Sequence, residues 1–227
     1  MLLKIPSLLT SSDVAECRRL LEKTDWVDGR VTAGEMAAMV KNNTQIPADS
    51  PVARRLRKLI LERLEQNGLF NAAAIPQKIS PPLFNRYSVG QHYGSHLDAA
   101  IRKIDGGGDR LRSDLSATLF LSEMDDYDGG ELIIEDAFGI RTVKLAAGDM
   151  ILYPATSVHH VEPVKRGVRL AAFFWVQSMV RDDGDRTLLL QLHAAIQRVK
   201  RNVPQDLTTV LQLENVHNNL MRRLADT

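Results

Sequence analysis

The spacing of hydrophobic positions divides the chain into three regions. In residues 1–77 apolar side chains recur mostly every three or four positions, which is the period of an amphipathic helix. In residues 78–178 they form short runs separated by Gly, Pro and Asp, a pattern typical of strands joined by turns. The helical spacing returns in residues 179–227. We therefore expect an α+β protein, with N-terminal helices packed on a β-rich core and a C-terminal helical extension.

Two helices of the first region have recognisable ends. Asp13 and Glu16 lie three residues apart and offer a capping pair for the first helix. In the second helix Ser50 can cap the first turn, Pro51 suits the first helical position, and Gly68 follows the predicted end. One face of the second helix is basic, with Arg54, Arg55, Arg57, Lys58 and Arg63. A nucleic-acid contact and a solvated surface both fit this face.

The central region is predicted to be a jelly roll. From Asp114 to Ser122 apolar residues alternate with polar ones such as Ser116 and Thr118. Further strands are predicted over residues 131–135, 140–145, 150–153, 158–161 and 168–176. Many short strands at regular spacing are typical of a sandwich or barrel, and we place a double-stranded β-helix here. Gly106-Gly107-Gly108 lacks the spacing of a phosphate-binding loop and is predicted to be a mobile loop beside the site.

Pro204 divides the C-terminal region into two amphipathic helices. Such a pair usually packs on its own domain, and a contact that makes a homo-oligomer is the alternative. The net charge of +1 favours neither nucleic acid nor a membrane surface as a partner. The single cysteine, Cys17, excludes an internal disulfide and fits a reducing compartment. Residues 1–6 lack the pattern of a signal peptide, and no apolar run is long enough to span a bilayer, so we expect a cytoplasmic protein.

Candidate metal ligands fall into two clusters of the β-rich region. His96 and Asp98 are two residues apart, and on a strand such positions share one face, so both side chains can reach one ion. His159 and His160 are adjacent and should point to opposite faces, so one of them should bind. Two imidazoles and one carboxylate are the facial triad of non-haem Fe(II) oxygenases. Zinc accepts the same ligands and remains an alternative at this point.

Arg169 is the second unusual feature, because it begins an otherwise apolar run. A buried arginine needs an anionic partner, and its guanidinium can hold a carboxylate by two parallel hydrogen bonds. A dicarboxylate that binds a metal at one end could present its other end to Arg169. The alternatives are an ion pair with a protein carboxylate such as Glu131, or exposure at the end of the strand.

Four segments resemble a known family. Asn85 to Asp98 (NRYSVGQHYGSHLD) resembles the Tyr-x-x-Gly-x-x-Tyr-x-x-His-x-Asp signature of prolyl hydroxylase-like 2-oxoglutarate oxygenases. Residues 128–132 (DGGEL) resemble the Gly-Gly-Glu-Leu turn of that superfamily. Residues 148–154 (GDMILYP) and 157–164 (SVHHVEPV) are similar to the bacterial PKHD-type hydroxylases, whose helical C-terminal extension this chain also matches.

The resemblance implies a role for each candidate residue. The iron ligands of the family fall on His96, Asp98 and His159, and its 2-oxoglutarate-binding basic residue, ten positions after the distal histidine, falls on Arg169. Tyr87 matches a tyrosine that commonly hydrogen-bonds the co-substrate. Many prolyl hydroxylases carry lysine at the position of Arg169, and either cation suits a carboxylate. His160 receives no role.

The implied activity is that of an Fe(II)- and 2-oxoglutarate-dependent dioxygenase, a hydroxylase that uses O₂ and releases succinate and CO₂. The resemblance also implies L-ascorbate as a reductant. The prime substrate is left open between a protein or peptide side chain and a siderophore-like small molecule. A cupin-type metal enzyme that is not an oxygenase is one alternative, and an iron- or oxygen-sensing binding module is the other.

Overall fold

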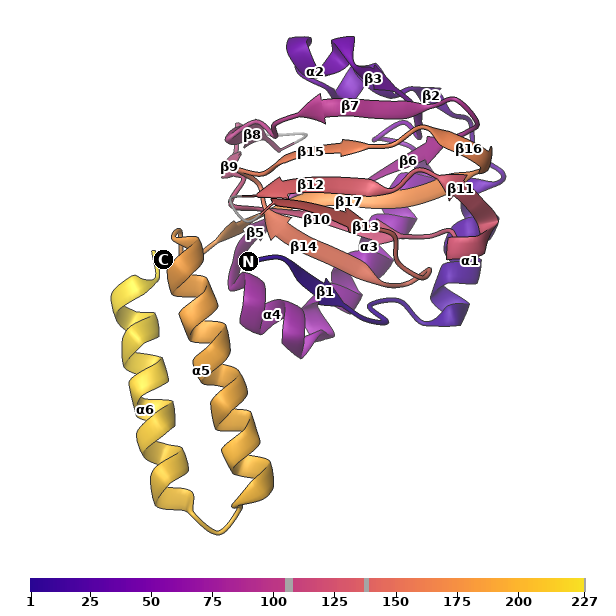
Figure 1. Ribbon diagram of the computed structural model, residues 1–227. Helices are drawn as coiled ribbons and strands as arrows, with labels where there is room; N and C mark the ends of the chain where they lie inside the picture. The colour runs from indigo at the N-terminus through magenta and orange to yellow at the C-terminus, as the bar shows by residue number, and fades with distance from the viewer. Residues whose placement is uncertain (105–107, 137–138, 227) are drawn as a thin grey trace.

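A computed structural model describes residues 1–104, 108–136 and 139–226 of the chain. Two antiparallel sheets pack face to face, with helices on the outer face of the larger sheet (Figure 1). In spatial order the larger sheet contains β1 (Leu3–Ile5), β14 (Met150–Pro154), β10 (Leu115–Phe120), β17 (Arg169–Ser178), β6 (Leu83–Tyr87), β4 (Thr44–Gln45) and β2 (Val27–Asp28), and β5 (Pro76–Ile79) also pairs with β17. The smaller sheet contains β13 (Gly139–Val143), β12 (Leu132–Asp136), β15 (Val158–Val161), β7 (His92–His96) and β3 (Lys41–Asn42).

Short elements connect these sheets. Two ribbons pair β11 (Tyr127–Gly129) with β16 (Val164–Gly167), and β8 (Ile101–Lys103) with β9 (Arg110–Arg112). Single 3₁₀ turns form at η1 (Gly29–Thr32) and η2 (Met124–Asp126). The helices are α1 (Ser11–Leu21), α2 (Glu35–Met39), α3 (Pro51–Gln66), α4 (Gly68–Ala74), α5 (Asp183–Asn202) and α6 (Leu207–Leu224). The predicted jelly-roll core with flanking helices is thereby confirmed.

Both faces of β10 are buried, each in a different core. Leu115, Ala117 and Leu119 pack with α1, α3 and α4 in one core, which occupies the outer face of the larger sheet. The other parity turns inward, where Phe120 joins a second core between the two sheets. Ser116 and Thr118 share this inward face and are buried too. The polar positions of the strand therefore face the interior of the jelly roll.

The N-terminal region differs in detail from the prediction. It supplies the short strands β1 to β4 as well as helices, and these strands extend both sheets. The first helix is capped by Thr10, whose hydroxyl accepts a hydrogen bond from the backbone N–H of Asp13, and the Asp13 carboxylate accepts one from the N–H of Thr10. The proposed pairing of Asp13 with Glu16 as the cap was therefore wrong.

The second helix begins and ends where predicted. The Ser50 hydroxyl accepts a hydrogen bond from the N–H of Ala53, which confirms it as the N-cap with Pro51 in the first turn. The helix ends at Gln66, so Gly68 follows its end as predicted, and Gly68 also begins the next helix, α4. Asn67 stands between the two helices and accepts a hydrogen bond from the N–H of Phe70. The short turn at Asn67 lets α3 and α4 cover one face of the sheet.

The C-terminal helices form a hairpin that projects from the body of the molecule (Figure 1). Its base packs through Leu189 and Val180 against Ile75, next to partly buried residues near the end of α6. The N-terminal ammonium of Met1 forms an ion pair with Asp183 at the start of α5. In the described part of the chain, none of the helices is long and apolar enough to cross a bilayer. The division at residues 77 and 178 stays a prediction, as does the mobile glycine loop, because residues 105–107 lie outside the described part.

Candidate active site

Strand register brings the two predicted histidines together. His159 of β15 lies directly opposite His96 of β7 in the antiparallel pair, and opposed side chains of such a pair are neighbours. Their ring centroids are 4.3 Å apart. Asp98 lies two residues beyond the end of β7, and its Oδ2 is 3.7 Å from His159 Nε2. One ligand atom from each of the three residues lies within 4.8 Å of the others, which could hold a metal ion.

Hydrogen bonds to the backbone orient both imidazoles. His96 Nδ1 lies 2.8 Å from the carbonyl oxygen of Gly94, and His159 Nδ1 lies 3.0 Å from that of Ser157. Each Nδ1–H therefore donates to a carbonyl, which leaves Nε2 as the nitrogen with a free lone pair. Burial, with the nearby His159, lowers the pKa of His96 to about 4, so its imidazole is neutral at physiological pH. A neutral imidazole with Nε2 unprotonated is the form that binds a metal.

Asp98 is fixed by groups that the sequence did not single out. Ser116 donates a 2.6 Å hydrogen bond to Oδ2, and Arg102 Nη2 lies 3.1 Å from Oδ1. Burial acts to raise the pKa of Asp98, but His159, Ser116, Trp175 and Arg102 together outweigh it, so the pKa lies below its usual value. The residue therefore stays a carboxylate. Ser116 and Trp175 reach it together because they are directly opposed in the β10–β17 pair.

The structure settles which of the adjacent histidines faces the site. The side chain of His159 is buried in the cavity, while His160 lies on the opposite face of β15, as strand alternation predicts. His160 Nε2 lies 3.1 Å from the Glu162 carboxylate and its Nδ1 lies 3.5 Å from the Ser95 hydroxyl.

Arg169 lies inside the molecule, with 1% of its surface exposed. Tyr87 is its antiparallel partner on β6, and the guanidinium carbon lies 5.3 Å from the Tyr87 ring and 5.2 Å from the Phe120 ring. Within the described residues, Nε and Nη1 of Arg169 have no hydrogen-bond partner and no carboxylate is within 4 Å of it. Exposure at the strand end and a pair with Glu131 are thus both excluded. Two unsatisfied N–H groups on a buried cation fit a carboxylate ligand.

Tyr87 is buried beside Arg169, and burial raises the pKa of its hydroxyl, which the Arg169 charge and Asn43 oppose. The phenol is therefore a hydrogen-bond donor at neutral pH. Together these residues line one cavity of about 370 Å³, which His96, Asp98, His159, Tyr87 and Arg169 all reach.

Sequence reasoning missed several residues of this cavity. Ser116 could have been found from the sequence, because it is a polar residue that alternates with Leu115 and Ala117 along a predicted strand. Tyr93 stacks on His96, with ring centroids 3.7 Å apart, and Tyr153 meets His159 edge to face at 5.3 Å. Lys41 also lines the cavity, from a strand of two residues. A strand that short leaves no periodic pattern to detect.

Comparisons with known proteins agree with this geometry. Residues 82–177 match the 2OG-Fe(II) oxygenase superfamily, and residues 183–226 match the PKHD-type hydroxylase C-terminal domain. A PKHD-type hydroxylase of Methylobacillus flagellatus is 54% identical over 227 residues, which covers both chains completely. One of Bordetella pertussis is 53% identical over 226 residues, again with both chains covered completely.

Solved structures with low sequence identity share the fold. HygX of Streptomyces hygroscopicus, solved with nickel, 2-oxoglutarate and hygromycin B bound, has a TM-score of 0.56 at 17% identity. The match covers 78% of this chain and 82% of that one. A 2OG-Fe(II) oxygenase family oxidoreductase of Burkholderia pseudomallei has a TM-score of 0.55 at 16% identity, with 78% and 84% covered. Of the classes that the sequence left open, the full-length relatives favour the oxygenase. The chain belongs to the PKHD-type hydroxylase family and is a 2-oxoglutarate-dependent dioxygenase of the 2OG-Fe(II) oxygenase superfamily.

Proposed function

We propose that His96, Asp98 and His159 hold Fe(II) and that Arg169, with Tyr87, binds the distal carboxylate of 2-oxoglutarate. The carrying observation is the convergence of two imidazoles and one carboxylate in the same cavity as a buried arginine whose Nε and Nη1 have no hydrogen-bond partner among the described residues. A site of three ligands leaves coordination positions open, which suits a co-substrate and O₂. A closed structural zinc site would use a fourth protein ligand, and the described residues near the triad offer none.

The residues of the chain position the reactants. When bound, iron supplies the redox chemistry that couples conversion of 2-oxoglutarate and O₂ to succinate and CO₂ with hydroxylation of a substrate C–H bond. The backbone carbonyls of Gly94 and Ser157 hold both imidazoles in the binding tautomer. Ser116 fixes one oxygen of Asp98. Arg169 provides two parallel donors for a carboxylate and thereby orients the co-substrate.

The proposal has further parts, which concern the reductant, the location and the partners. L-ascorbate as the reductant and a cytoplasmic location follow from the family resemblance and the reducing-compartment composition. Exposed apolar residues on the C-terminal hairpin, Leu188, Leu207 and Leu211, support a homo-oligomer. A balanced overall charge supports the proposal that neither nucleic acid nor a membrane is the main partner.

The test is reconstitution of the protein with Fe(II) and 2-oxoglutarate without oxygen, followed by oxygen addition and measurement of succinate. We expect succinate from the wild type and none above background from the His96→Ala/Asp98→Ala variant, with and without ascorbate. Wild-type protein that demonstrably binds iron but forms no more succinate than this variant would refute the proposal.

A further inference from the structure

A second cationic group lies inside the same cavity. Lys41 follows α2 and pairs with Tyr93 at the edge of the smaller sheet, and 6% of its surface is exposed. Its Nζ lies 5.1 Å from the centroid of the Tyr93 ring and 5.8 Å from that of Phe173. It donates one 3.0 Å hydrogen bond, to the Thr32 hydroxyl. An ammonium has three N–H donors, so Lys41, which lines the cavity, has donors beyond the one given to Thr32.

Lys41 is short of negative charge. In the described part of the chain no carboxylate lies within 4 Å of its Nζ. Burial, together with the nearby positive charge of Arg102, lowers the pKa of Lys41 to about 8. Arg102 itself pairs with Asp98, stacks its guanidinium carbon 3.2 Å from the centre of the Trp175 ring, and has no partner for Nε among the described residues. Buried Lys41 and partly buried Arg102 thus lie close together, and Asp98, the carboxylate paired with Arg102, acts on Lys41 only from beyond 4 Å, as does Asp28. A buried charge without a close partner is costly.

These cations are separate from the Arg169 site. Alternation along β17 turns Arg169, Phe173 and Trp175 toward the cavity. Lys41 stands over Phe173 and Arg102 over Trp175, whereas Arg169 begins the strand. At roughly 3.3 Å per residue, the backbone of Phe173 is about 13 Å from that of Arg169. An anion bound at Arg169 therefore leaves the charges over Phe173 and Trp175 unmet.

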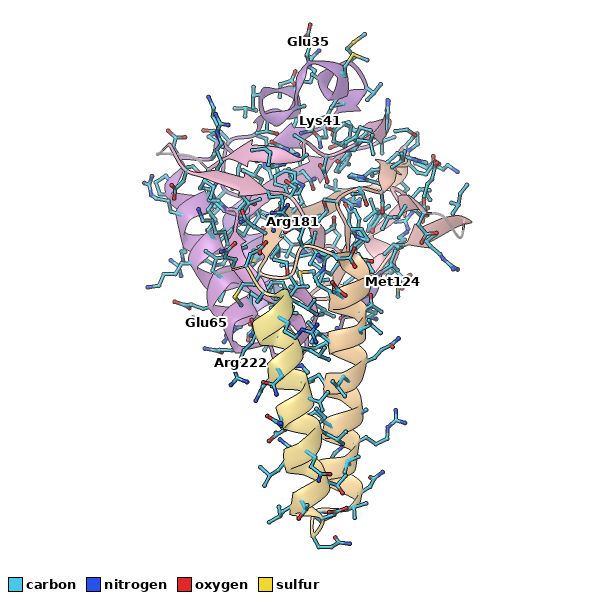
Figure 2. The ribbon with its side chains drawn as sticks, turned by 90° about the vertical axis from the view of Figure 1, so that its left-hand side faces the viewer. Glu35, Lys41, Glu65, Met124, Arg181 and Arg222 are labelled. Atoms are coloured by element: carbon cyan, nitrogen blue, oxygen red, sulfur yellow. The ribbon has the colours of Figure 1, made fainter. Side chains whose placement is uncertain are left out.

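The Lys41 end of the cavity faces its entrance. Figure 2 shows Glu35 at the outer tip of the molecule, with Lys41 beneath it and nearer the sheets. Met36 and Leu97 also line the cavity, yet 79% and 59% of their surfaces are exposed, so the cavity reaches solvent beside them. A molecule that enters there passes exposed apolar side chains first and then meets Lys41.

We propose that Lys41, assisted by Arg102, binds a carboxylate group of the prime substrate. The rings of Phe173 and Trp175 contact the apolar part next to that carboxylate, and Met36 and Leu97 contact the part that remains near the entrance. This assignment rests on the proposed function, since it names the substrate class of the same site. It makes Lys41 a substrate-binding residue, over Phe173 of β17, and Arg169 a co-substrate-binding residue, at the start of β17.

The test measures binding without turnover. The full chain is loaded with Mn(II) and saturating 2-oxoglutarate under anaerobic conditions and titrated calorimetrically with phenylacetate or with its neutral analogue phenylacetamide. We expect phenylacetate to bind the wild type at least tenfold more tightly. Lys41→Met should abolish the preference and Lys41→Arg should retain most of it. Lys144→Met is the control. The Nζ of Lys144 lies 4.1 Å from the centroid of the Tyr127 ring, outside the cavity, so the preference for phenylacetate should persist in this variant.

A second arm distinguishes a free acid from a peptide carboxylate. It compares N-acetyl-aspartyl-phenylalaninamide with its asparaginyl analogue in the same titration. A carboxylate preference in either arm that Lys41→Met removes supports the proposal. Wild-type protein without a preference in both arms overturns it, as does a preference that Lys41→Met leaves intact. The affinity for 2-oxoglutarate in the variant gives a third readout, since a loss as large as that for the probe would place Lys41 in the co-substrate site.

Failure here is distinct from failure of the proposed function. Succinate formation by the wild type depends on iron and 2-oxoglutarate and is measured without either probe. If succinate forms and the probes show no charge preference, the oxygenase assignment stands and the role of Lys41 falls. Lys41→Gln provides a second neutral variant in case Lys41→Met fails to fold.

Discussion

The sharpest consequence of the site geometry concerns Arg169→Met. The guanidinium is buried, and Nε and Nη1 have no partner in the described part of the chain. Methionine is unbranched and flexible and can fill most of the space that the arginine stem occupies. The substitution therefore removes the charge and the donors while preserving much of the packing against Tyr87 and Phe120.

The expected loss of binding follows from the donors that are available. Hydrogen bonds to charged groups contribute about 1.5–3 kcal/mol each, and truncating one partner of a buried charge pair costs about 2–5 kcal/mol. A loss of about 3 kcal/mol corresponds to a rise of about 100-fold in the dissociation constant of 2-oxoglutarate, since 1.4 kcal/mol is a factor of ten. The metal ligands do not contact Arg169 in any described hydrogen bond, so metal affinity should change little.

The same substitution should not lower the free energy of unfolding of the protein without 2-oxoglutarate. A buried cation without a counter-ion destabilises the folded state, so its removal should leave the free energy of unfolding unchanged or increase it. Calorimetric titration of Mn(II)-loaded protein with 2-oxoglutarate, combined with urea unfolding, measures both quantities. Arg141→Met, on an exposed position of β13, is the matched control and should alter neither. Parallel losses of stability, metal affinity and 2-oxoglutarate affinity in Arg169→Met would refute the reasoning and make Arg169 a structural residue.

Three further variants probe the surroundings of the site and the packing of the helices. Ser116→Ala removes the 2.6 Å hydrogen bond to Asp98. A metal titration should show Mn(II) binding weakened about tenfold, because loss of a group that supports a metal ligand usually has this effect. Unchanged affinity would show that Asp98 needs no such support. His160→Ala should keep metal affinity within about twofold, since its ring lies outside the cavity, and a loss comparable to that of a ligand variant would contradict the assignment. The Arg63 hydrogen bond lowers the pKa of Asp13 to about 2, below the unfolded value of about 3.9. Its stabilisation is therefore present above about pH 4 and lost as the pH falls toward 2, so wild type and Asp13→Asn should differ in urea unfolding at pH 7 and converge by about pH 2, whereas a constant difference would exclude this linkage.

Much of the core architecture could be predicted from the sequence because its strands carry a strong pattern. In residues 115–120 one face carries Leu115, Ala117 and Leu119, the other carries Ser116 and Thr118 before Phe120, and β10 occupies these residues. The alternation also predicted that His159 and His160 face apart. The strands β1 to β4 were missed because runs of two or three residues contain too few positions for a period to be visible. Tertiary pairing, rather than local propensity, makes them strands.

Strand periodicity explains only part of how Asp98 comes to lie beside His96 and His159. Strand periodicity predicts that His96 and Asp98 share a face, yet Asp98 lies beyond the last residue of β7. Its carboxylate reaches the histidines because Ser116 on β10 of the facing sheet and Arg102 hold it there. The spacing pointed to residues that the fold brings together, while contacts between distant segments decide the geometry.

Arg169 and Lys41 lie in different parts of the cavity, and the sequence reveals the burial of Arg169 more readily than that of Lys41. Arg169 stands out because it interrupts an apolar run, so its charge must be buried with the strand that carries it. Lys41 is followed by Asn42 and Asn43 and reads as a surface lysine, although 6% of its surface is exposed. Its burial results from the pairing of β3 with β7 and from the rings of Tyr93 and Phe173 above it. The proposed co-substrate end is therefore built into regular β-structure, whose pattern can be detected, and the proposed substrate end depends on short polar segments folded across it. Because the charge that would select the substrate lies on those segments, sequence alone leads to the chemistry of this enzyme sooner than to the molecule that it oxidises.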